Sequence, residues 1–143
     1  MLPAEVVRKF LECLEVRDVD AAMELLSPDV VYQNVSLPTL RGRERVRRAF
    51  RWLANGRTGF EVTFHTVAAE GGSVLTERTD VLLIGPLRMQ IWVCGRFDVR
   101  DGQIELWRDY FDFWNATLAL ARGLLALVIP AFAPPTPAES PQE

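Results

Sequence analysis

The sequence predicts one α+β domain, in which three helices close one face of a curved antiparallel sheet. Apolar residues recur at helical spacing in the first half of the 143-residue chain. The second half reads as long strands that are separated by short, glycine-containing turns. The length suits a single domain, predicted over 1–132, and a Pro-rich tail at 133–143 that we expect to be disordered or loosely draped.

The helices are expected in the N-terminal half. An apolar stripe predicts a helix over 3–16, and a second, short helix is expected to run through Leu26. Ser27-Pro28-Asp29 is a turn-forming combination, and it precedes a short β-prone run at 30–34. A third helix is predicted over 43–54, with apolar residues on one stripe and arginines elsewhere.

Four strands follow in the second half, and short turns between them indicate an antiparallel meander. The predicted strands are 60–69, 73–84, 88–100 and 103–112. With the helices on one face of this sheet, the interior of the domain becomes an apolar cone.

The last apolar stretch, 116–132, raises the question of a membrane span. It is short of the ~20 residues that a span needs, and Arg122 and Pro130 interrupt it. We expect a helix that covers a pocket or a partner subunit, without stable membrane insertion; a helix lying on a membrane surface is the alternative. The first five residues lack the basic and apolar parts of a signal peptide, which favours a cytoplasmic location.

Composition excludes several kinds of site. A net charge of −3 argues against a nucleic-acid partner, although arginines gather between 41 and 57. Two cysteines and one histidine are too few for a structural zinc site or a His-rich metal site. Any catalysis is therefore expected to depend on carboxylates, arginine and tyrosine.

Two charged residues share the inner face of one predicted strand. Arg78 and Asp80 are two residues apart, which places them on one face about 6.6 Å from each other, in line with the apolar Leu82. An unpaired charge inside an apolar wall would cost several kcal/mol. The two side chains therefore need each other, and the sum of charges suggests a third partner.

Asp109 is the candidate for that partner. Its strand is two positions away from that of Arg78, or about 9.6 Å, so the middle strand must leave room for the arginine. We expect Gly95 at that level, because Ile91 and Val93 then also face inward. A slip of one residue would place Cys94 there and reverse the face of the strand.

These residues leave two interpretations open. The charged group is either a buried structural ion network or a catalytic Asp–Arg–Asp arrangement. Tyr32 and Asn34 share a face of the short strand, and a phenol with an amide can hold one water molecule. A buried tyrosine with a satisfied hydroxyl is the alternative for this second cluster.

Taken together, four segments resemble the limonene-1,2-epoxide hydrolase family over roughly Val6 to Asp112. They are Tyr32-Gln33-Asn34, Glu77-Arg78-Thr79-Asp80, Gly95 with Phe97, and Trp107-Arg108-Asp109-Tyr110-Phe111-Asp112. The resemblance implies a cone-shaped cystatin/NTF2-like fold, in which N-terminal helices pack into the concave face of a curved mixed sheet. It also implies a homodimer that uses neither a metal nor an organic cofactor.

The resemblance implies an activity as well, the hydrolysis of an apolar epoxide to a vicinal diol. It assigns catalysis to Arg78, Asp80 and Asp109, and the holding of water to Tyr32 and Asn34. We expect Asp109 to act as general base and Asp80 as general acid in one step, because a single strand-bound histidine disfavours a covalent route. For this role the pKa of Asp80 must be raised by its apolar surroundings and the neighbouring negative charge.

The segment 84–88 and the Leu-rich end resemble a branch of the family that accepts bulkier lipophilic epoxides. The expected pocket lining comes from the sheet and from two helices, and consists of Leu82, Ile91, Val93, Phe111, Leu14 and Leu53. Two other functions stay open. One is a proton-transfer isomerase or cyclase of the same superfamily, and the other is a non-catalytic lipid-binding module.

Overall fold

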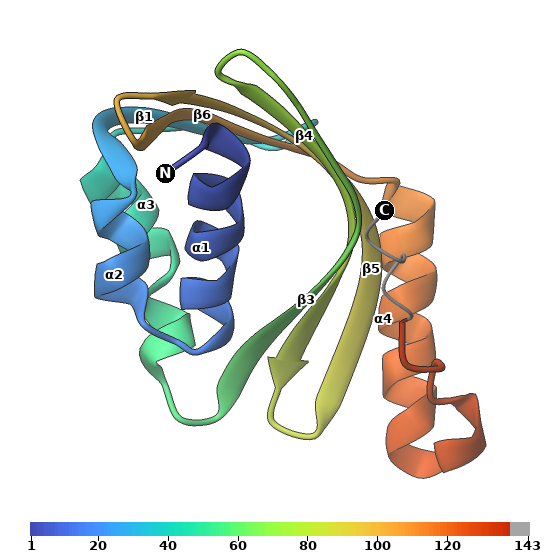
Figure 1. Cartoon of the computed structure of the whole chain (residues 1–143). Helices are drawn as coiled ribbons and strands as arrows, with labels where there is room; N and C mark the ends of the chain where they lie inside the picture. The colour runs from blue at the N-terminus through green and yellow to red at the C-terminus, as the bar shows by residue number, and fades with distance from the viewer. Residues whose placement is uncertain (138–143) are drawn as a thin grey trace.

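The computed structural model of the chain describes residues 1–137. One six-stranded sheet curves around three N-terminal helices, and a fourth helix lies on its outer side (Figure 1). The helices are α1 (Pro3–Glu15), α2 (Val19–Glu24), α3 (Arg43–Ala49) and α4 (Phe113–Val128), with the 3₁₀ helices η1 (Arg51–Ala54) and η2 (Pro130–Phe132). The strands are β1 (Leu26–Asn34), β2 (Leu40–Arg41), β3 (Thr58–Glu70), β4 (Ser73–Ile84), β5 (Leu87–Arg100) and β6 (Gln103–Tyr110).

The sheet is mixed, with strand order β2-β1-β6-β5-β4-β3. The last four strands form the antiparallel meander that the turn residues predict. β1 pairs in parallel with β6, so an N-terminal strand lies beside the last one. The predicted curved mixed sheet, with helices in its concave face, is confirmed.

The concave face of the sheet and α1 form the core. The apolar stripe of α1 is fully buried, and Phe10 packs edge-on against Trp107, with ring centroids 4.9 Å apart. Burying such a side chain contributes roughly 1.5–3 kcal/mol, so the stripe holds this helix firmly in the cone. α1 therefore fills much of the concave side of the sheet, and its Leu14 borders the cavity that remains.

Three predicted boundaries in the first half are wrong. Leu26 begins β1 and does not end a helix, and residues 27–29 lie within that strand, where its register against β6 shifts. Such an irregularity accommodates the missing N–H of Pro28, so strand pairing overrides the local turn chemistry. The helix predicted over 43–54 breaks at Phe50 into α3 and η1. The three-residue repeat of a 3₁₀ helix brings Phe50 and Leu53 onto one face, toward the interior.

The strand predicted over 103–112 ends at Tyr110, because Asp112 caps a helix instead. The Asp112 carboxylate accepts a hydrogen bond from Trp114 N at 2.8 Å, so α4 begins three residues earlier than the apolar stretch suggested. None of the described helices is both long enough and apolar enough to span a bilayer. The cytoplasmic location expected from the sequence stays a prediction.

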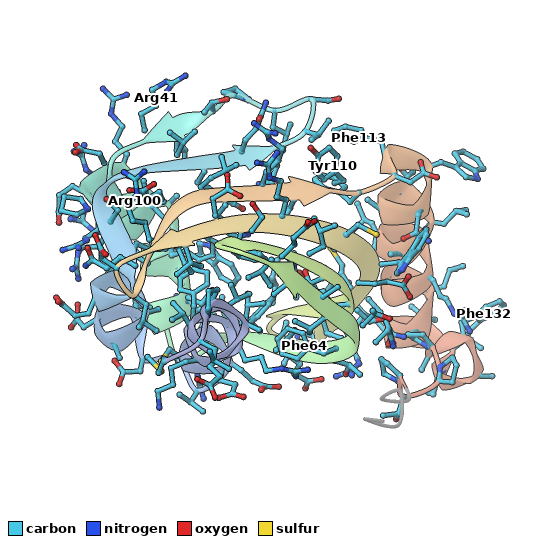
Figure 2. The ribbon with its side chains drawn as sticks, turned by 45° about the horizontal axis from the view of Figure 1, so that its top comes forward. Arg41, Phe64, Arg100, Tyr110, Phe113 and Phe132 are labelled. Atoms are coloured by element: carbon cyan, nitrogen blue, oxygen red, sulfur yellow. The ribbon has the colours of Figure 1, made fainter. Side chains whose placement is uncertain are left out.

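Helix α4 lies against β5 on the outer side of the sheet (Figure 1). Its sheet-facing side carries small residues: Gly123 is buried against Arg88, and the side-chain oxygen of Asn115 accepts a bond from Trp92 N at 3.3 Å. The larger apolar side chains are exposed, and Figure 2 shows Phe132, just after α4, pointing away from the sheet. Of the expected Pro-rich tail, Pro135 accepts a hydrogen bond from Gln90, and residues 138–143 lie outside the described residues.

Candidate active site

The centre of the site is Arg78, whose side chain is fully buried on the inner face of β4. Its Nε donates a hydrogen bond to Asp80 Oδ1 at 2.9 Å, and its Nη2 donates to Asp80 Oδ2 at 3.1 Å. This two-point contact is the strongest geometry between a guanidinium and a carboxylate. It forms because strand alternation places residues 78 and 80 on the same face.

The same guanidinium reaches a second carboxylate two strands away. Arg78 Nη2 lies 2.8 Å from Asp109 Oδ1, across the intervening strand β5. The residue at that level is Gly95, which pairs with Asp109, and a Cβ atom there would collide with the guanidinium. The predicted register is therefore confirmed, and Cys94 is exposed on the opposite face of the strand.

One cation and two carboxyl groups share this apolar interior. Burial, helped by the negative charge of Asp109 and opposed by Arg78, raises the pKa of Asp80 from 3.8 to about 6. Burial by itself would lower the pKa of Arg78, but the two carboxylates outweigh it and raise that pKa. The guanidinium therefore stays charged, while Asp80 retains its proton to much higher pH than an exposed aspartate.

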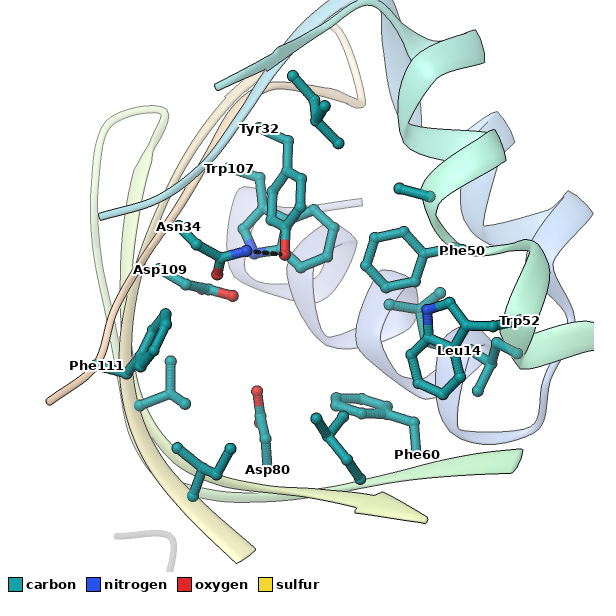
Figure 3. A pocket seen from close by; sticks show the side chains of 16 residues that line it. Leu14, Tyr32, Asn34, Phe50, Trp52, Phe60, Asp80, Trp107, Asp109 and Phe111 are labelled. Atoms are coloured by element: carbon teal, nitrogen blue, oxygen red, sulfur yellow. Dashed lines mark hydrogen bonds between the residues drawn. The ribbon is translucent and has the colours of Figure 1, made fainter. Parts of the chain in front are cut away.

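Tyr32 and Asn34 extend the polar group from the neighbouring strand. Asn34 pairs in register with Asp109, so β1 brings its side chain beside that carboxylate. Asn34 Nδ2 donates a hydrogen bond to Tyr32 Oη at 2.7 Å, drawn as a dashed line in Figure 3. Burial, followed by the charge of Asp109, raises the pKa of Tyr32. The phenol therefore keeps its proton and can donate it in a hydrogen bond.

These polar groups point into one cavity of about 380 Å³. Figure 3 shows Asp80, Asp109 and Asn34 directed to its interior, with aromatic side chains opposite them. All six residues expected to line the pocket do so, namely Leu14, Leu53, Leu82, Ile91, Val93 and Phe111. α4 contributes no lining residue, so it does not cover this cavity.

Sequence reasoning missed a set of aromatic lining residues. Phe50, Trp52 and Phe60 line the side of the cavity opposite the carboxyl groups, and Trp107 lies under Tyr32 at a centroid distance of 4.0 Å. Phe50 was already on the apolar stripe predicted for the third helix, which was a usable signal. Trp52 reaches the cavity only because the helix tightens after Phe50, and periodicity alone does not reveal that change.

Among residues 1–137, no group of three or more His, Cys, Asp or Glu side chains is placed to bind a metal ion. The arrangement can still move protons. A raised carboxyl pKa, a second carboxylate and a bridging cation in an apolar cavity form a candidate general acid–base pair.

Comparisons with known proteins bear on the family. The family model described as "Limonene-1,2-epoxide hydrolase catalytic domain" matches residues 1–122. Epoxide hydrolase EphG of Mycobacterium tuberculosis is 50% identical over 125 residues, which cover 87% of this chain and 83% of that protein. The structure of an M. tuberculosis LEH-like epoxide hydrolase matches with a TM-score of 0.88 and 47% identity, over 94% of this chain and 95% of that one.

A more distant structure supports the fold alone. It is an NTF2-like protein of unknown function from Cytophaga hutchinsonii, with a TM-score of 0.66 and 20% identity over 78% of this chain and 91% of that one. The family model, by contrast, extends over most of the chain. It includes every residue of the polar cluster, which consists of Tyr32, Asn34, Arg78, Asp80 and Asp109. The chain therefore belongs to the limonene-1,2-epoxide hydrolase family, which confirms both the predicted enzyme class and the predicted fold.

Proposed function

We propose that this member of an epoxide hydrolase family adds water to an apolar epoxide in a single step, giving a vicinal diol. Asp109 is the general base, Asp80 the general acid, and Arg78 bridges them. One observation carries this proposal. A fully buried arginine holds two carboxyl groups that both open into the same apolar cavity. A merely structural ion network would not need both groups to reach a cavity.

The hydrogen bonds around Asn34 support a water site. Because Tyr32 Oη accepts the Asn34 amide proton, its own proton is free to bind a water oxygen. The Asn34 side-chain oxygen and Asp109 can then accept the two protons of that water. One lone pair of the water remains, and it is the pair that attacks the epoxide carbon.

The proton and bond changes balance within this group. The water oxygen bonds to carbon while Asp109 takes a water proton, and the epoxide C–O bond breaks while Asp80 gives its proton to the leaving oxygen. Each proton transfer is worth about 10²–10⁴ in rate. Negative charge passes from Asp109 to Asp80, and Arg78 contacts both carboxyl groups. Exchange with solvent water then resets the two protons.

The cavity lining supports an uncharged, apolar substrate. Apart from the polar cluster, the lining consists of aliphatic and aromatic side chains. A charged substituent would lose its hydration there without gaining a partner. We therefore propose a lipophilic epoxide of a size that a cavity of about 380 Å³ can hold, in line with the bulkier substrates that the sequence suggests.

Two carboxyl groups favour hydrolysis over the alternatives. An isomerase that moves a proton beside a carbonyl needs one carboxylate, and a lipid carrier needs none. Asp80→Asn and Asp109→Asn should each lower diol formation from an apolar epoxide at least 1,000-fold, on the order of one lost proton transfer, and leave the circular dichroism spectrum unchanged. Asp29→Asn, on an exposed aspartate, is the matched control. Near-normal activity in either variant would refute the assignment.

A single turnover in ¹⁸O-water separates the one-step route from a covalent one. In the proposed route the label enters the diol at the first turnover. In a route through an ester intermediate, the first diol carries an unlabelled oxygen from the carboxylate, and the label appears in Asp80 or Asp109 instead. Mass spectrometry of the diol and of the peptides that contain these residues distinguishes the two.

We also propose that the chain forms a homodimer through the exposed side of α4. Trp114, Leu118, Leu125 and Val128 recur along one stripe of this helix, and all four are exposed. A stripe of this kind is typical of a surface that a partner covers. The enzyme would need only water and its epoxide besides this second copy, with no nucleic acid and no cofactor.

A further inference from the structure

Arg78 has one nitrogen that neither carboxylate binds. Nε and Nη2 are used by Asp80 and Asp109, whereas Nη1 donates a hydrogen bond to Thr76 Oγ1 at 3.0 Å. Thr76 is only 3% exposed and Arg78 is fully buried, so this hydroxyl occupies a place that bulk water does not reach. Without it, Nη1 would lose its partner inside the protein.

Arg78 and the two carboxyl groups that it binds, Asp80 and Asp109, form what we call the clamp. Thr76 lies at the same level of the sheet as this clamp. Thr76 pairs with Gly95 on β5, and Gly95 pairs with Asp109 on β6. A Cβ atom at Gly95 would lie 2.9 Å from both Thr76 Oγ1 and Asp109 Oδ1. The hydroxyl and the carboxylate therefore flank the same empty position, and the guanidinium edge lies between them.

We propose that Thr76 is a positioning residue for the epoxide hydrolysis assigned above. Its hydroxyl holds Nη1 and thereby fixes the plane in which Nη2 touches Asp109 while Nε and Nη2 touch Asp80. The role rests on the proposed function, because the step needs both carboxyl groups bound to one guanidinium at the same time. Thr76 itself does not line the cavity.

The kind of side chain fits this role. A hydroxyl is a neutral acceptor, so it orients the cation without adding a third negative charge that would compete with Asp80 and Asp109. Threonine is also stiff at χ1, and strand geometry limits its rotamers further. The hydroxyl oxygen is therefore held on the inner face of β4, where the guanidinium passes.

The test compares Thr76→Val with Thr76→Ser. Valine keeps the shape and removes the acceptor, whereas serine keeps the acceptor. We expect Thr76→Val to lower kcat about 10- to 100-fold, on the scale of one lost hydrogen bond to a charged group, with KM within about twofold of wild type. The kcat of Thr76→Ser should stay within about threefold of the wild-type value. If Thr76→Val does not fold, Thr76→Ala against Thr76→Ser makes the same comparison.

The pH profile separates positioning from a stabilising role. The alkaline limb of kcat follows loss of the Asp80 proton, and Arg78 lowers the pKa of that carboxyl. A loosened guanidinium lowers it less, so this limb should move to higher pH in Thr76→Val and return in Thr76→Ser. A variant that is only less stable would lose amplitude without moving the limb. An unmoved limb, or a serine variant no better than valine, would overturn the proposal.

A readout independent of turnover keeps this inference apart from the proposed function. In ¹⁵N-arginine-labelled protein, the Nη1 protons of Arg78 should exchange slowly with solvent in wild type and Thr76→Ser, and at least tenfold faster in Thr76→Val. If no epoxide yields a diol with wild-type protein, the function fails while this exchange pattern still reports on the clamp. Equal exchange in all three proteins would refute the role of Thr76.

Discussion

At the scale of single residues, the site keeps ionisable side chains in an apolar interior that disfavours charge. Asp80 is 9% exposed and Asp109 is 5% exposed, and one cation serves both. Burial keeps the pKa of Asp80 near 6, which suits the role of general acid proposed for it. The same burial makes the ionised form of Asp80 unfavourable in the folded protein, so the proposed general acid lowers the stability of the fold at neutral and higher pH.

Because the ionised carboxylate of Asp80 is unfavourable in the apolar interior, we predict that Asp80→Asn stabilises the fold above pH 6. The pKa of Asp80 is about 6 when folded and 3.8 as an ordinary aspartate, so protonated Asp80 favours folding below pH 3.8. That contribution is lost as pH rises toward 6. The neutral variant avoids the loss, and its free energy of unfolding should exceed that of wild type by about 3 kcal/mol at pH 8.

Urea unfolding at pH 4, 5.5 and 8 measures this difference. The gap between Asp80→Asn and wild type should be near zero at pH 4 and largest at pH 8. Asp29→Asn, on the exposed surface, should show no such trend. A gap that does not change with pH would mean that the folded pKa of Asp80 is not raised.

A second residue-scale prediction concerns Gly95. Gly95→Ala places a methyl group where the guanidinium passes, so Arg78 must leave Asp109 or the strands must separate. We expect diol formation to fall at least 100-fold, since both carboxyl groups depend on Arg78, and the melting temperature to fall by several degrees. Gly56→Ala is the control, because no atom lies within 4 Å of its added Cβ. Activity near wild type in Gly95→Ala would contradict the described clamp.

At the scale of elements, the second half of the chain was easier to predict than the first. Gly71, Gly85 and Gly102 have positive φ in the turns between strands, so local chemistry fixes where β3, β4 and β5 end. The start of β1 and the break after α3 depend on pairing with β6 and on packing in the core. Such distant contacts are not visible in a local pattern, which explains why those boundaries were wrong.

The same contrast applies to the site. The clamp could be predicted because strand alternation and one glycine determine which side chains meet across β4, β5 and β6. The Tyr32–Asn34 pair was visible in the sequence, but its place beside Asp109 depends on the parallel pairing of β1 with β6. Thr76 could not be predicted, because a threonine in a strand is ordinary and its hydrogen bond from Arg78 depends on how the arginine side chain folds back along β4.

An element-scale prediction tests how α4 is held. A Cβ atom at Gly123 would lie 2.5 Å from Arg88 O and 3.0 Å from Leu87 Cδ1, so Gly123→Ala forces the helix away from β5. Alanine favours helix formation by about 1 kcal/mol, yet we expect a lower melting temperature, because the steric cost is larger. Activity should change less than twofold, since α4 does not line the cavity.

Glu12→Gly provides the control for that experiment, because it lowers helix propensity at an exposed position of α1, outside the proposed dimer surface. It should lower the melting temperature only by the amount that corresponds to the lower helix propensity of glycine, about 1 kcal/mol. If Gly123→Ala melts above wild type, the close approach of α4 to the β4–β5 hairpin is wrong. If activity falls tenfold or more, α4 affects the cavity after all.

At the scale of the whole molecule, the apolar side of α4 has no covering element among residues 1–137. We predict a homodimer, which light scattering coupled to size-exclusion chromatography measures directly. Leu118→Lys with Leu125→Lys should give a monomer, because each lysine would be desolvated in the interface. Val16→Lys, at an exposed apolar residue that follows α1, is the control for added charge. A wild-type monomer, or a double variant that stays dimeric, would contradict this surface.

The monomer should keep its catalytic activity, since every residue that lines the cavity precedes α4. The last of them is Phe111, and the helix begins at Phe113. A mutation after this point changes no residue that lines the cavity and acts through whatever α4 contacts. This end of the chain can therefore be redesigned to alter how copies of the protein associate, with the cavity wall left as it is.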